Sequence, residues 1–299
     1  MTTTNTAPNA AATRRGMVVA VVAIMMFAGI DVCSKLLGAQ MPVIQVIWLR
    51  FVFFLPIAVL LAYRPGRGIT WRTNRPWLHV FRVVLLVVEM WFFIAAFAAM
   101  PLADVHSIGA IAPLLVTALS VPILGERVGW RRWAAIGVGF IGVLVILRPG
   151  TTAVGLPAVY ALIGASLWAF YQVVLRIVGR YDAAATTALW TAVIGALSSS
   201  LVGPFFWEVP SASGWMLLGA VTLLGGFGHT IYSRAFTLAP ASTLQPFTYL
   251  LLVFATLFGW LIFGDVPDRW TIAGASLIVA SGLYTFHRTR VRSVEQRVS

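Results

Sequence analysis

Two five-residue stretches decide the fold: residues 97–101 read FAAMP, and residues 236–240 read FTLAP. They lie 139 positions apart, and at the same spacing Gly125-Glu126 aligns with Gly264-Asp265. Matched residues that recur in the same order at one spacing indicate an internal repeat. The two halves of the chain are therefore expected to be copies of one unit.

Further matches extend the repeat in both directions from these stretches. After a gap of two residues, Trp133-x3-Gly137 meets Trp270-x3-Gly274. Towards the N-terminus, residues 27–35 meet residues 168–176 at a spacing of 141. Each copy thus spans close to half of the 299 residues.

The composition indicates that the repeated unit lies in a membrane. Apolar residues make up 60% of the chain, charged residues 10%, and the mean hydropathy is +0.91, values that exclude a water-soluble domain. The net charge of +12 does not indicate nucleic-acid binding, because it comes almost entirely from arginines in short segments between apolar runs. We therefore expect lipid as the surrounding medium and no nucleic-acid partner.

Apolar runs long enough to cross about 30 Å of hydrocarbon recur along the whole chain. They predict ten transmembrane helices, five in each half. The expected spans are residues 17–37, 43–63, 78–99, 103–124, 130–147, 154–175, 183–203, 214–237, 241–263 and 269–287.

The arginines predict how these spans are oriented. Alternating the loops between the two faces places 16 of the 21 basic residues on one face. By the positive-inside rule that face is cytoplasmic, so the protein is predicted to be a multi-pass protein of the inner (plasma) membrane with both termini in the cytoplasm. The sixteen are Arg14, Arg15, Arg64, Arg67, Arg72, Arg75, Arg127, Arg131, Arg132, Arg176, Arg180, Arg234, Arg288, Arg290, Arg292 and Arg297.

An odd number of helices in each copy has a topological consequence. The second copy enters the membrane from the opposite face, so the copies are inverted about an axis in the membrane plane. The predicted fold is an all-α integral membrane protein of ten transmembrane helices, arranged as two inverted five-helix repeats around a central cavity. We expect a disordered cytoplasmic tail at 1–16, repeats at 17–148 and 149–287, and a basic cytoplasmic tail at 288–299.

These motifs resemble one family of membrane proteins. The residues that carry the resemblance are Lys35, Trp48-Leu49-Arg50, Ala165-Ser166-Leu167-Trp168 and the Pro…Gly-Glu/Asp…Trp-x3-Gly run of both halves. Together they resemble the ten-helix EamA-type branch of the drug/metabolite transporter superfamily over residues 17–287. The resemblance implies a secondary transporter that works by alternating access. Within the family the chain most resembles amino-acid exporters of the YddG type, which implies export of neutral or aromatic amino acids. Because the family also contains drug exporters and relatives that carry nucleotide-sugars, the resemblance implies transport more firmly than it implies a substrate.

Glu89 and His229 are the first candidates for a substrate site. Glu89 lies midway through the third span without a basic residue within one helical turn, and an ionisable group at that depth costs about 3 kcal/mol unless a partner or a wet cavity receives it. At the 139-residue spacing Glu89 aligns with Gly228, next to His229, so a carboxylate and an imidazole reach similar depths. For Glu89, a structural hydrogen bond and a role as proton carrier or ammonium-binding group both stay open, as do packing and cavity lining for His229.

Polar residues among aromatic ones supply four more candidates. Trp168 and Gln172 lie within about one turn of the sixth span, where an aromatic face beside an amide suits a zwitterion with an apolar side chain. Gln245 and Tyr249 share one face of the ninth span at i, i+4. The alternative for Trp168 is a place in the aromatic belt at the membrane interface.

Two prolines predict bends in the transmembrane helices. Pro113 lies near the middle of the fourth span, and Pro246 lies early in the ninth. Each proline frees a backbone carbonyl, which favours a bend that lines a cavity, a hinge, or a static kink.

Three charged residues lie close to the outer face. Asp31 and Lys35 share a face of the first helix, and Arg50 enters the second helix at a comparable depth. Mutual neutralisation in an ion-pair network is one interpretation, and an outer gate or direct substrate contact are the others.

The main alternative class is a membrane-embedded enzyme acting on a lipid or lipid-linked substrate. That function would need a nucleophile with a base or a metal-binding set, and neither His-Glu-x-x-His nor Gly-x-Ser-x-Gly occurs. A single cysteine, Cys33, excludes a cysteine-based metal cluster, and the lack of a Walker A motif disfavours ATP-driven pumping. We therefore predict no enzyme, no metal and no cofactor. The expected partners are a small-molecule substrate, the lipid bilayer and, if Glu89 titrates, the proton.

Overall fold

The computed structural model describes residues 10–64, 68–69, 71–125, 128–148, 155–239 and 241–298. In these residues the chain is helical apart from loops and a two-residue antiparallel ladder. The elements are α1 (Ala10–Gly38), α2 (Val43–Ala62), β1 (Tyr63–Arg64), β2 (Gly68–Ile69), α3 (Pro76–Ala99), α4 (Leu102–Gly109), α5 (Ala112–Leu124), α6 (Trp130–Leu147), α7 (Gly155–Val178), α8 (Ala184–Ser200), η1 (Gly203–Phe206), α9 (Ala212–Leu238), α10 (Ala241–Leu244), η2 (Gln245–Tyr249), α11 (Leu250–Phe258), η3 (Gly259–Phe263) and α12 (Arg269–Val298).

Ten helical segments of the described chain correspond to the ten expected spans. Eight of them are long and apolar enough to cross a membrane by length and composition. The other two are α8, which has only 17 residues, and α12, whose apolar part continues into an arginine-rich extension. Many large apolar side chains on these helices are exposed, as expected of a surface that faces lipid.

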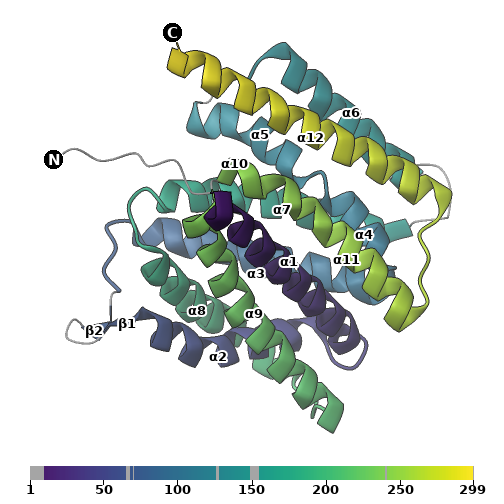
Figure 1. Cartoon of the computed structure of the whole chain (residues 1–299). Helices are drawn as coiled ribbons and strands as arrows, with labels where there is room; N and C mark the ends of the chain where they lie inside the picture. Colours follow the sequence, from purple (N-terminus) through teal and green to yellow (C-terminus); the bar gives the residue numbers. More distant parts are fainter. Residues whose placement is uncertain are drawn as a thin grey trace.

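Helix packing repeats between the two halves. Extensive contacts join α1 to α9 and α3 to α7, two pairs that the inverted repeat makes equivalent. Two further pairs, α2 with α8 and α6 with α12, each join a helix to its own repeat equivalent. In Figure 1, α1 begins and α12 ends on the side of the bundle that carries β1 and β2. We call this side the arginine-rich end and the opposite side the arginine-poor end.

Prolines and glycines set where the broken helices turn. The fourth span is interrupted between α4 and α5, where Pro113 occupies the first turn of α5, and the ninth changes to a 3-10 turn at Pro246. These are the two positions at which bends were expected. Gly125 and Gly264 end the two spans with φ of 70° and 72°, in the left-handed region that favours glycine. The repeat therefore extends to backbone conformation.

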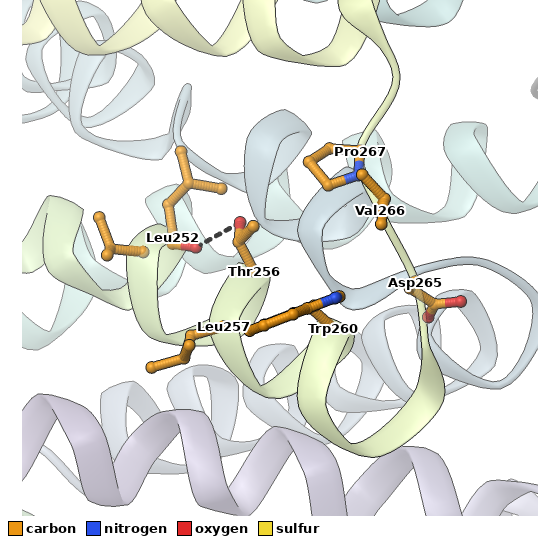
Figure 2. Close-up of a pocket in the computed structure, with 8 residues that line it drawn as sticks. Leu252, Thr256, Leu257, Trp260, Asp265, Val266 and Pro267 are labelled. Atoms are coloured by element: carbon orange, nitrogen blue, oxygen red, sulfur yellow. Dashed lines mark hydrogen bonds between the residues drawn. The ribbon is translucent and has the colours of Figure 1, made fainter.

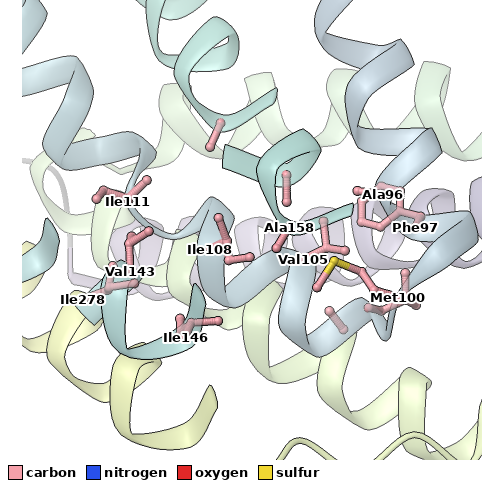
Figure 3. Close-up of a cluster of buried hydrophobic side chains, with 14 of the residues drawn as sticks. Ala96, Phe97, Met100, Val105, Ile108, Ile111, Val143, Ile146, Ala158 and Ile278 are labelled. Atoms are coloured by element: carbon pink, nitrogen blue, oxygen red, sulfur yellow. The ribbon is translucent and has the colours of Figure 1, made fainter. Parts of the chain in front are cut away.

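Two apolar clusters fill most of the interior. One joins α4, α6, α7 and α12 through residues such as Ile108, Val143, Ala158 and Ile278 (Figure 3). The other, which we call the outer apolar cluster, joins α1, α2 and α9 and includes Ile30, Met41, Val46, Leu218 and Val221. Within a membrane such clusters stabilise mainly through close packing, because lipid is as apolar as the side chains.

The two chain ends differ from the expected tails. Residues 10–16 form the first turns of α1, so the prediction that residues 1–16 are disordered was wrong for residues 10–16. Residues 1–9 lie outside the described part. At the other end α12 continues without interruption to Val298, so the basic segment from residue 288 to 298 is helical. Both extensions arise because a helix that leaves the membrane can keep its backbone hydrogen bonds in water.

Candidate functional site

Four charged or titratable residues from four helices meet inside the bundle. Arg50 of α2 interacts electrostatically with the carboxylates of Asp31 on α1 and Glu89 on α3. The Nε2 atom of His106 on α4 lies 3.0 Å from Oδ2 of Asp31. This distance allows an ion pair, although Nε2 makes no hydrogen bond of regular geometry within the described chain. We call Asp31, Arg50, Glu89 and His106 the interior charge cluster.

Each member of the cluster is held by its helix and its neighbours. Ser34, one turn after Asp31, donates to the carbonyl of Ile30 at 2.7 Å and accepts from Arg50 Nη1 at 3.2 Å. Glu89 is 6% exposed, whereas Asp31 and Arg50 are half-buried. A carboxylate at this depth is retained because a guanidinium shares its environment.

The cluster combines charges of both signs in one place. Two carboxylates interact electrostatically with one guanidinium, and the His106 imidazole lies next to Asp31. Since a guanidinium binds carboxylates and a carboxylate binds ammonium groups, the arrangement offers a complementary partner to each end of a zwitterion.

His229 lies near this cluster. Its ring is 5.0 Å from that of Phe27 on α1, and it interacts electrostatically with Arg50. Tyr232, one turn further on α9, meets the same Phe27 ring edge-on at 5.5 Å. His229 is nevertheless exposed, although this face of α9 is turned towards α1.

Trp168 and Gln172 lie on α7, towards the arginine-rich end. Trp168 stacks on Tyr171 with ring centroids 5.2 Å apart, and both Trp168 and Gln172 are half-buried. Tyr171 interacts electrostatically with Glu89 and accepts a hydrogen bond from Arg82 at 3.1 Å. The structure thus connects the Trp168 region to Glu89 through Tyr171.

Tyr249 and Gln245 are not brought to the interior charge cluster by any described contact. The Tyr249 hydroxyl packs against Gly282 of α12, where it is buried and has no hydrogen-bond partner among the described residues. The shared face predicted for the ninth span changes because residues 245–249 form a 3-10 turn rather than an α-helix. The Gln245 side chain lies outside the described part of the structure.

Lys35 pairs with a partner that the expected network did not include. Its Nζ atom is 3.2 Å from Asp265 Oδ2 and donates to the carbonyl of Met100 at 2.9 Å. The predicted network of Asp31, Lys35 and Arg50 is therefore divided: Asp31 interacts with Arg50, and Lys35 joins α1 to the loop before α12. The reason is that the loop of the other repeat brings a carboxylate closer to Lys35 than its own helix does.

A second ion pair closes the same end of the molecule. Arg148, after α6, donates to Asp268, before α12, and Asp268 also accepts from the backbone N–H of Thr271 at 2.8 Å. Partial desolvation acts to raise the pKa of Asp268, but the hydrogen bonds from Thr271 and Arg148 outweigh it and lower that pKa.

Sequence reasoning missed two groups of functional candidates. His106 did not stand out because its partner, Asp31, lies on another helix 75 positions earlier. His79, Arg82 and Asp182 form a buried polar group at the arginine-rich end, although Asp182 lies 103 positions after His79 in the sequence. The available signal was that Arg82 lies within a predicted span, where an unpaired charge is costly.

A groove on the surface of α11 lies apart from these groups. Its volume is about 580 Å³, and it is lined by apolar residues such as Leu252, Val253 and Leu257, with Trp260 and Asp265 at one end (Figure 2). Val253, Leu257 and Trp260 are exposed. The groove therefore faces the lipid side of the helix rather than the interior charge cluster.

Comparison with known proteins places the chain among membrane transporters. The chain matches the EamA-like transporter family twice, over residues 14–148 and 155–286. The S-adenosylmethionine uptake transporter of Rickettsia prowazekii (strain Madrid E) is 28% identical over 257 residues, which cover 86% of this chain and 87% of the relative. A riboflavin transporter of Rhizobium johnstonii is 32% identical over 216 residues, 71% of each chain.

Two further comparisons extend over most of the molecule. The pseudopaline exporter CntI of Pseudomonas aeruginosa (strain UCBPP-PA14) is 27% identical over 270 residues, 90% of this chain and 94% of the relative. A solved crystal structure superposes with a TM-score of 0.60 at 23% identity, covering 92% of this chain and 99% of the other, a likeness of fold alone. The double family match confirms the two repeats and the expected EamA-type family. The three relatives are named for other substrates than the amino acids that the YddG-type resemblance implied.

Proposed function

This chain belongs to the EamA-like transporter family, and on that premise we propose that it moves a small zwitterionic metabolite across the inner membrane by alternating access. The observation that supports this most directly is the electrostatic interaction of Arg50 with the carboxylates of both Asp31 and Glu89. The carboxylate of the substrate binds the Arg50 guanidinium, and the ammonium group of the substrate replaces Arg50 as the partner of Asp31 and Glu89. Exchange of partners keeps every buried charge compensated, with and without substrate.

The surroundings of the cluster favour a substrate with a planar apolar part. Phe27, His229 and Tyr232 form a contiguous set of rings beside Arg50. Rings of this kind stack on aromatic groups. Neutral aromatic amino acids fit this combination, and they remain our first candidate substrates, with export as the expected direction.

The relatives favour two other candidates. S-adenosylmethionine also carries an amino-acid group and a planar base, so it fits the same two regions. Riboflavin has a planar ring system but no zwitterionic group, and for it the cluster would offer only hydrogen bonds. Charge on the substrate therefore separates these candidates.

Counterflow in proteoliposomes tests the proposal. The purified full-length protein is loaded on one side with an unlabelled candidate, and uptake of labelled tryptophan, phenylalanine, S-adenosylmethionine, riboflavin and an organic cation is compared. We expect accumulation of at least one zwitterion with a planar group. Decarboxylated tryptophan, which keeps the ring and the ammonium but lacks the carboxylate, should compete at least about tenfold less well, the factor that corresponds to about 1.4 kcal/mol.

The contrary outcome is equally specific. Accumulation of riboflavin alone, or equal competition by tryptophan and its decarboxylated analogue, would contradict recognition of a zwitterion. Liposomes without protein and liposomes with the Arg269→Gln variant serve as controls, since Arg269 lies over Trp270 at the start of α12, away from the cluster.

The orientation is a separate proposal with its own test. We propose that the arginine-rich end faces the cytoplasm, because most arginines lie there. In a Cys33→Ser background, an impermeant thiol reagent added to intact cells should label Ser211→Cys and leave Arg72→Cys unlabelled. The reverse pattern would overturn the orientation.

A further inference from the structure

Arg82 is fully buried near the arginine-rich end, where it joins three helices. Its Nη1 donates to the Tyr171 hydroxyl on α7 at 3.1 Å, and its Nη2 donates on α8 to Thr191 Oγ1 at 2.9 Å and the Thr187 carbonyl at 3.2 Å. Nη2 also lies 3.3 Å from His79 Nδ1. The Arg82 Nε atom is buried and has no hydrogen-bond partner in the described residues.

His79 connects Arg82 to the loop before α3 and to the loop between α7 and α8. Its Nε2 atom lies 3.0 Å from Asp182 Oδ2, in the loop between α7 and α8, and Asp182 also accepts from Thr73 at 2.7 Å. The imidazole, which is fully buried, stacks on Trp190 at 5.3 Å. We call Thr73, His79, Arg82, Tyr171, Asp182, Thr187 and Thr191 the inner polar cluster.

The contacts of His79 specify one protonation state. A guanidinium can only donate, so Nδ1 must accept from Arg82, and the proton of a neutral ring lies on Nε2, where it is donated to Asp182. A second proton on Nδ1 would point at a cationic donor 3.3 Å away. The closed arrangement is therefore built for neutral His79.

Protonation of His79 would be favoured by one neighbour and opposed by another. Asp182 would bind an imidazolium more strongly, whereas Arg82 and the burial of the ring oppose the added charge. Arg82 cannot lose its proton, so the contact between Arg82 and His79 is the one that breaks. The other titratable or polar groups from the elements around His79 are Arg75 and Thr73 of the preceding loop, Tyr181 of the α7–α8 loop, Tyr171 of α7, and Thr187 and Thr191 of α8.

The repeat shows what stands at the equivalent place on the arginine-poor end. At a spacing of 139, His79 and Arg82 correspond to Leu218 and Val221. At 141, residues 171, 182 and 187 correspond to residues 30, 41 and 46, which are Ile30, Met41 and Val46. All five equivalents belong to the outer apolar cluster. At these five positions the contacts are polar at the arginine-rich end and apolar at the arginine-poor end, while the equivalent of Thr191 is Arg50 of the interior charge cluster.

We propose that the inner polar cluster is the inner gate of this transporter and that His79 is a proton-binding site whose protonation from the arginine-rich side opens it. The proposal rests on the proposed transport function. When α3 separates from α7 and α8, water can replace the contacts among these charged and polar groups, whereas the five apolar equivalents hold no titratable group. Protonation of His79 therefore acts on the inner gate and has no counterpart among those five apolar positions.

Accessibility of a buried position tests this without any substrate. Val83, next to Arg82, is fully buried. Val83→Cys in a Cys33→Ser background is labelled with a thiol reagent at several pH values between 8 and 5.5. Each labelling rate is divided by the rate for the same cysteine in a His79→Gln background. The thiolate fraction changes equally in both proteins, so the ratio reports only the accessibility of the cysteine. Gln can accept from Arg82 and donate to Asp182 but does not titrate.

We expect the ratio to rise about tenfold as the pH falls, the change that one pKa unit between closed and open states produces. The matched variant His287→Gln, at an exposed histidine of the same end, should leave the wild-type profile unchanged. Asp182→Asn removes the charge that favours the imidazolium and should shift the midpoint to lower pH. A constant ratio, or an unshifted midpoint in Asp182→Asn, would overturn the proposal. Counterflow is measured separately, so failure of the gate and failure of transport are distinguishable.

Discussion

The two repeats share a backbone but differ in the chemistry of their interiors. Gly125 and Gly264 end equivalent segments with nearly the same left-handed φ, and α2 and α8 begin at equivalent positions 141 residues apart. The charges inside the bundle nevertheless come almost entirely from the first repeat. The repeats therefore share their backbone arrangement, and the residues that differ between them decide where the interior charges lie.

Equivalent interior positions make the difference explicit. The first repeat places a charged or titratable group where the second has a neutral residue or none. The equivalent pairs are Asp31 and Gln172, Arg50 and Thr191, Glu89 and Gly228, and His106 and Gln245. A substrate between the repeats would place its charged groups towards the first and its uncharged part towards the second, which is the basis of the following predictions.

Removing the cation of the first repeat should have the largest effect. Arg50→Gln is expected to weaken binding of a carboxylate-bearing substrate about 30- to 150-fold, because a charge-assisted hydrogen bond contributes about 2–3 kcal/mol. Equilibrium binding to purified protein measures this. The competition by a decarboxylated analogue should change much less than that by the intact substrate. An equal loss for both compounds would assign Arg50 to folding rather than to recognition.

Two equivalent glycines should differ in how they tolerate a methyl group. A Cβ on Gly274 would lie 2.5 Å from both the Gly142 carbonyl and Ile146 Cγ1, whereas a Cβ on Gly137 meets nothing within 4 Å. Gly274→Ala is expected to lower the free energy of unfolding by about 1–3 kcal/mol through overpacking of α6 on α12. Gly137→Ala should be neutral or stabilise by up to about 1 kcal/mol. Thermal melting in detergent distinguishes them, and similar shifts would contradict the close crossing.

Neutralising Glu89 tests whether the carboxylate acts on substrate or on protons. Glu89→Gln keeps the shape of the side chain but removes titration. If Glu89 binds the ammonium, apparent affinity should fall about tenfold at every pH, as for loss of about 1.4 kcal/mol. If it carries a proton, then in a His79→Gln background, where the proposed gate no longer titrates, Glu89→Gln should abolish the remaining pH dependence of flux while substrate exchange continues. Normal affinity with a normal pH profile would leave Glu89 only a structural hydrogen bond.

The neutral side of the site should contribute less. Gln172→Ala is expected to reduce apparent affinity about 2- to 10-fold, since a neutral hydrogen bond contributes about 0.5–1.5 kcal/mol. Charged and uncharged substrates should be affected alike. Ser166→Ala is the matched control, because the Ser166 hydroxyl donates to the carbonyl of Leu162 in its own helix. An effect as large as that of Arg50→Gln would contradict the division between repeats.

The smallest effect concerns the starts of two equivalent helices. Asp268 caps α12 through the N–H of Thr271, whereas its equivalent before α6 is Gly129. Asp268→Ala is expected to cost about 1 kcal/mol at neutral pH. Because the pKa of folded Asp268 lies below its ordinary value of 3.8, its stabilisation is present above that pH and is lost as the pH falls through the lowered pKa. Melting curves at pH 7 and pH 3 should therefore differ more for wild type than for the variant.

Part of the candidate site could be predicted from the sequence. Glu89, Asp31 and Arg50 stood out because charge at bilayer depth is costly, and the structure places them near one another. The partners of Lys35 and His106 could not be predicted, since Asp265 and Asp31 are distant in sequence. The prediction that Gln245 and Tyr249 share one helix face was wrong, because i, i+4 neighbours share a face in an α-helix, whereas residues 245–249 form a 3-10 turn.

By itself the sequence determined the medium, the number of spans and the repeat, because each depends on composition and spacing along the chain. Tertiary structure alone decided which buried groups meet. Polar side chains in a membrane interior take the nearest complementary partner, and proximity depends on how helices cross. His79, Arg82 and Asp182 therefore form one cluster, while their repeat equivalents, Leu218, Val221 and Met41, pack as apolar residues.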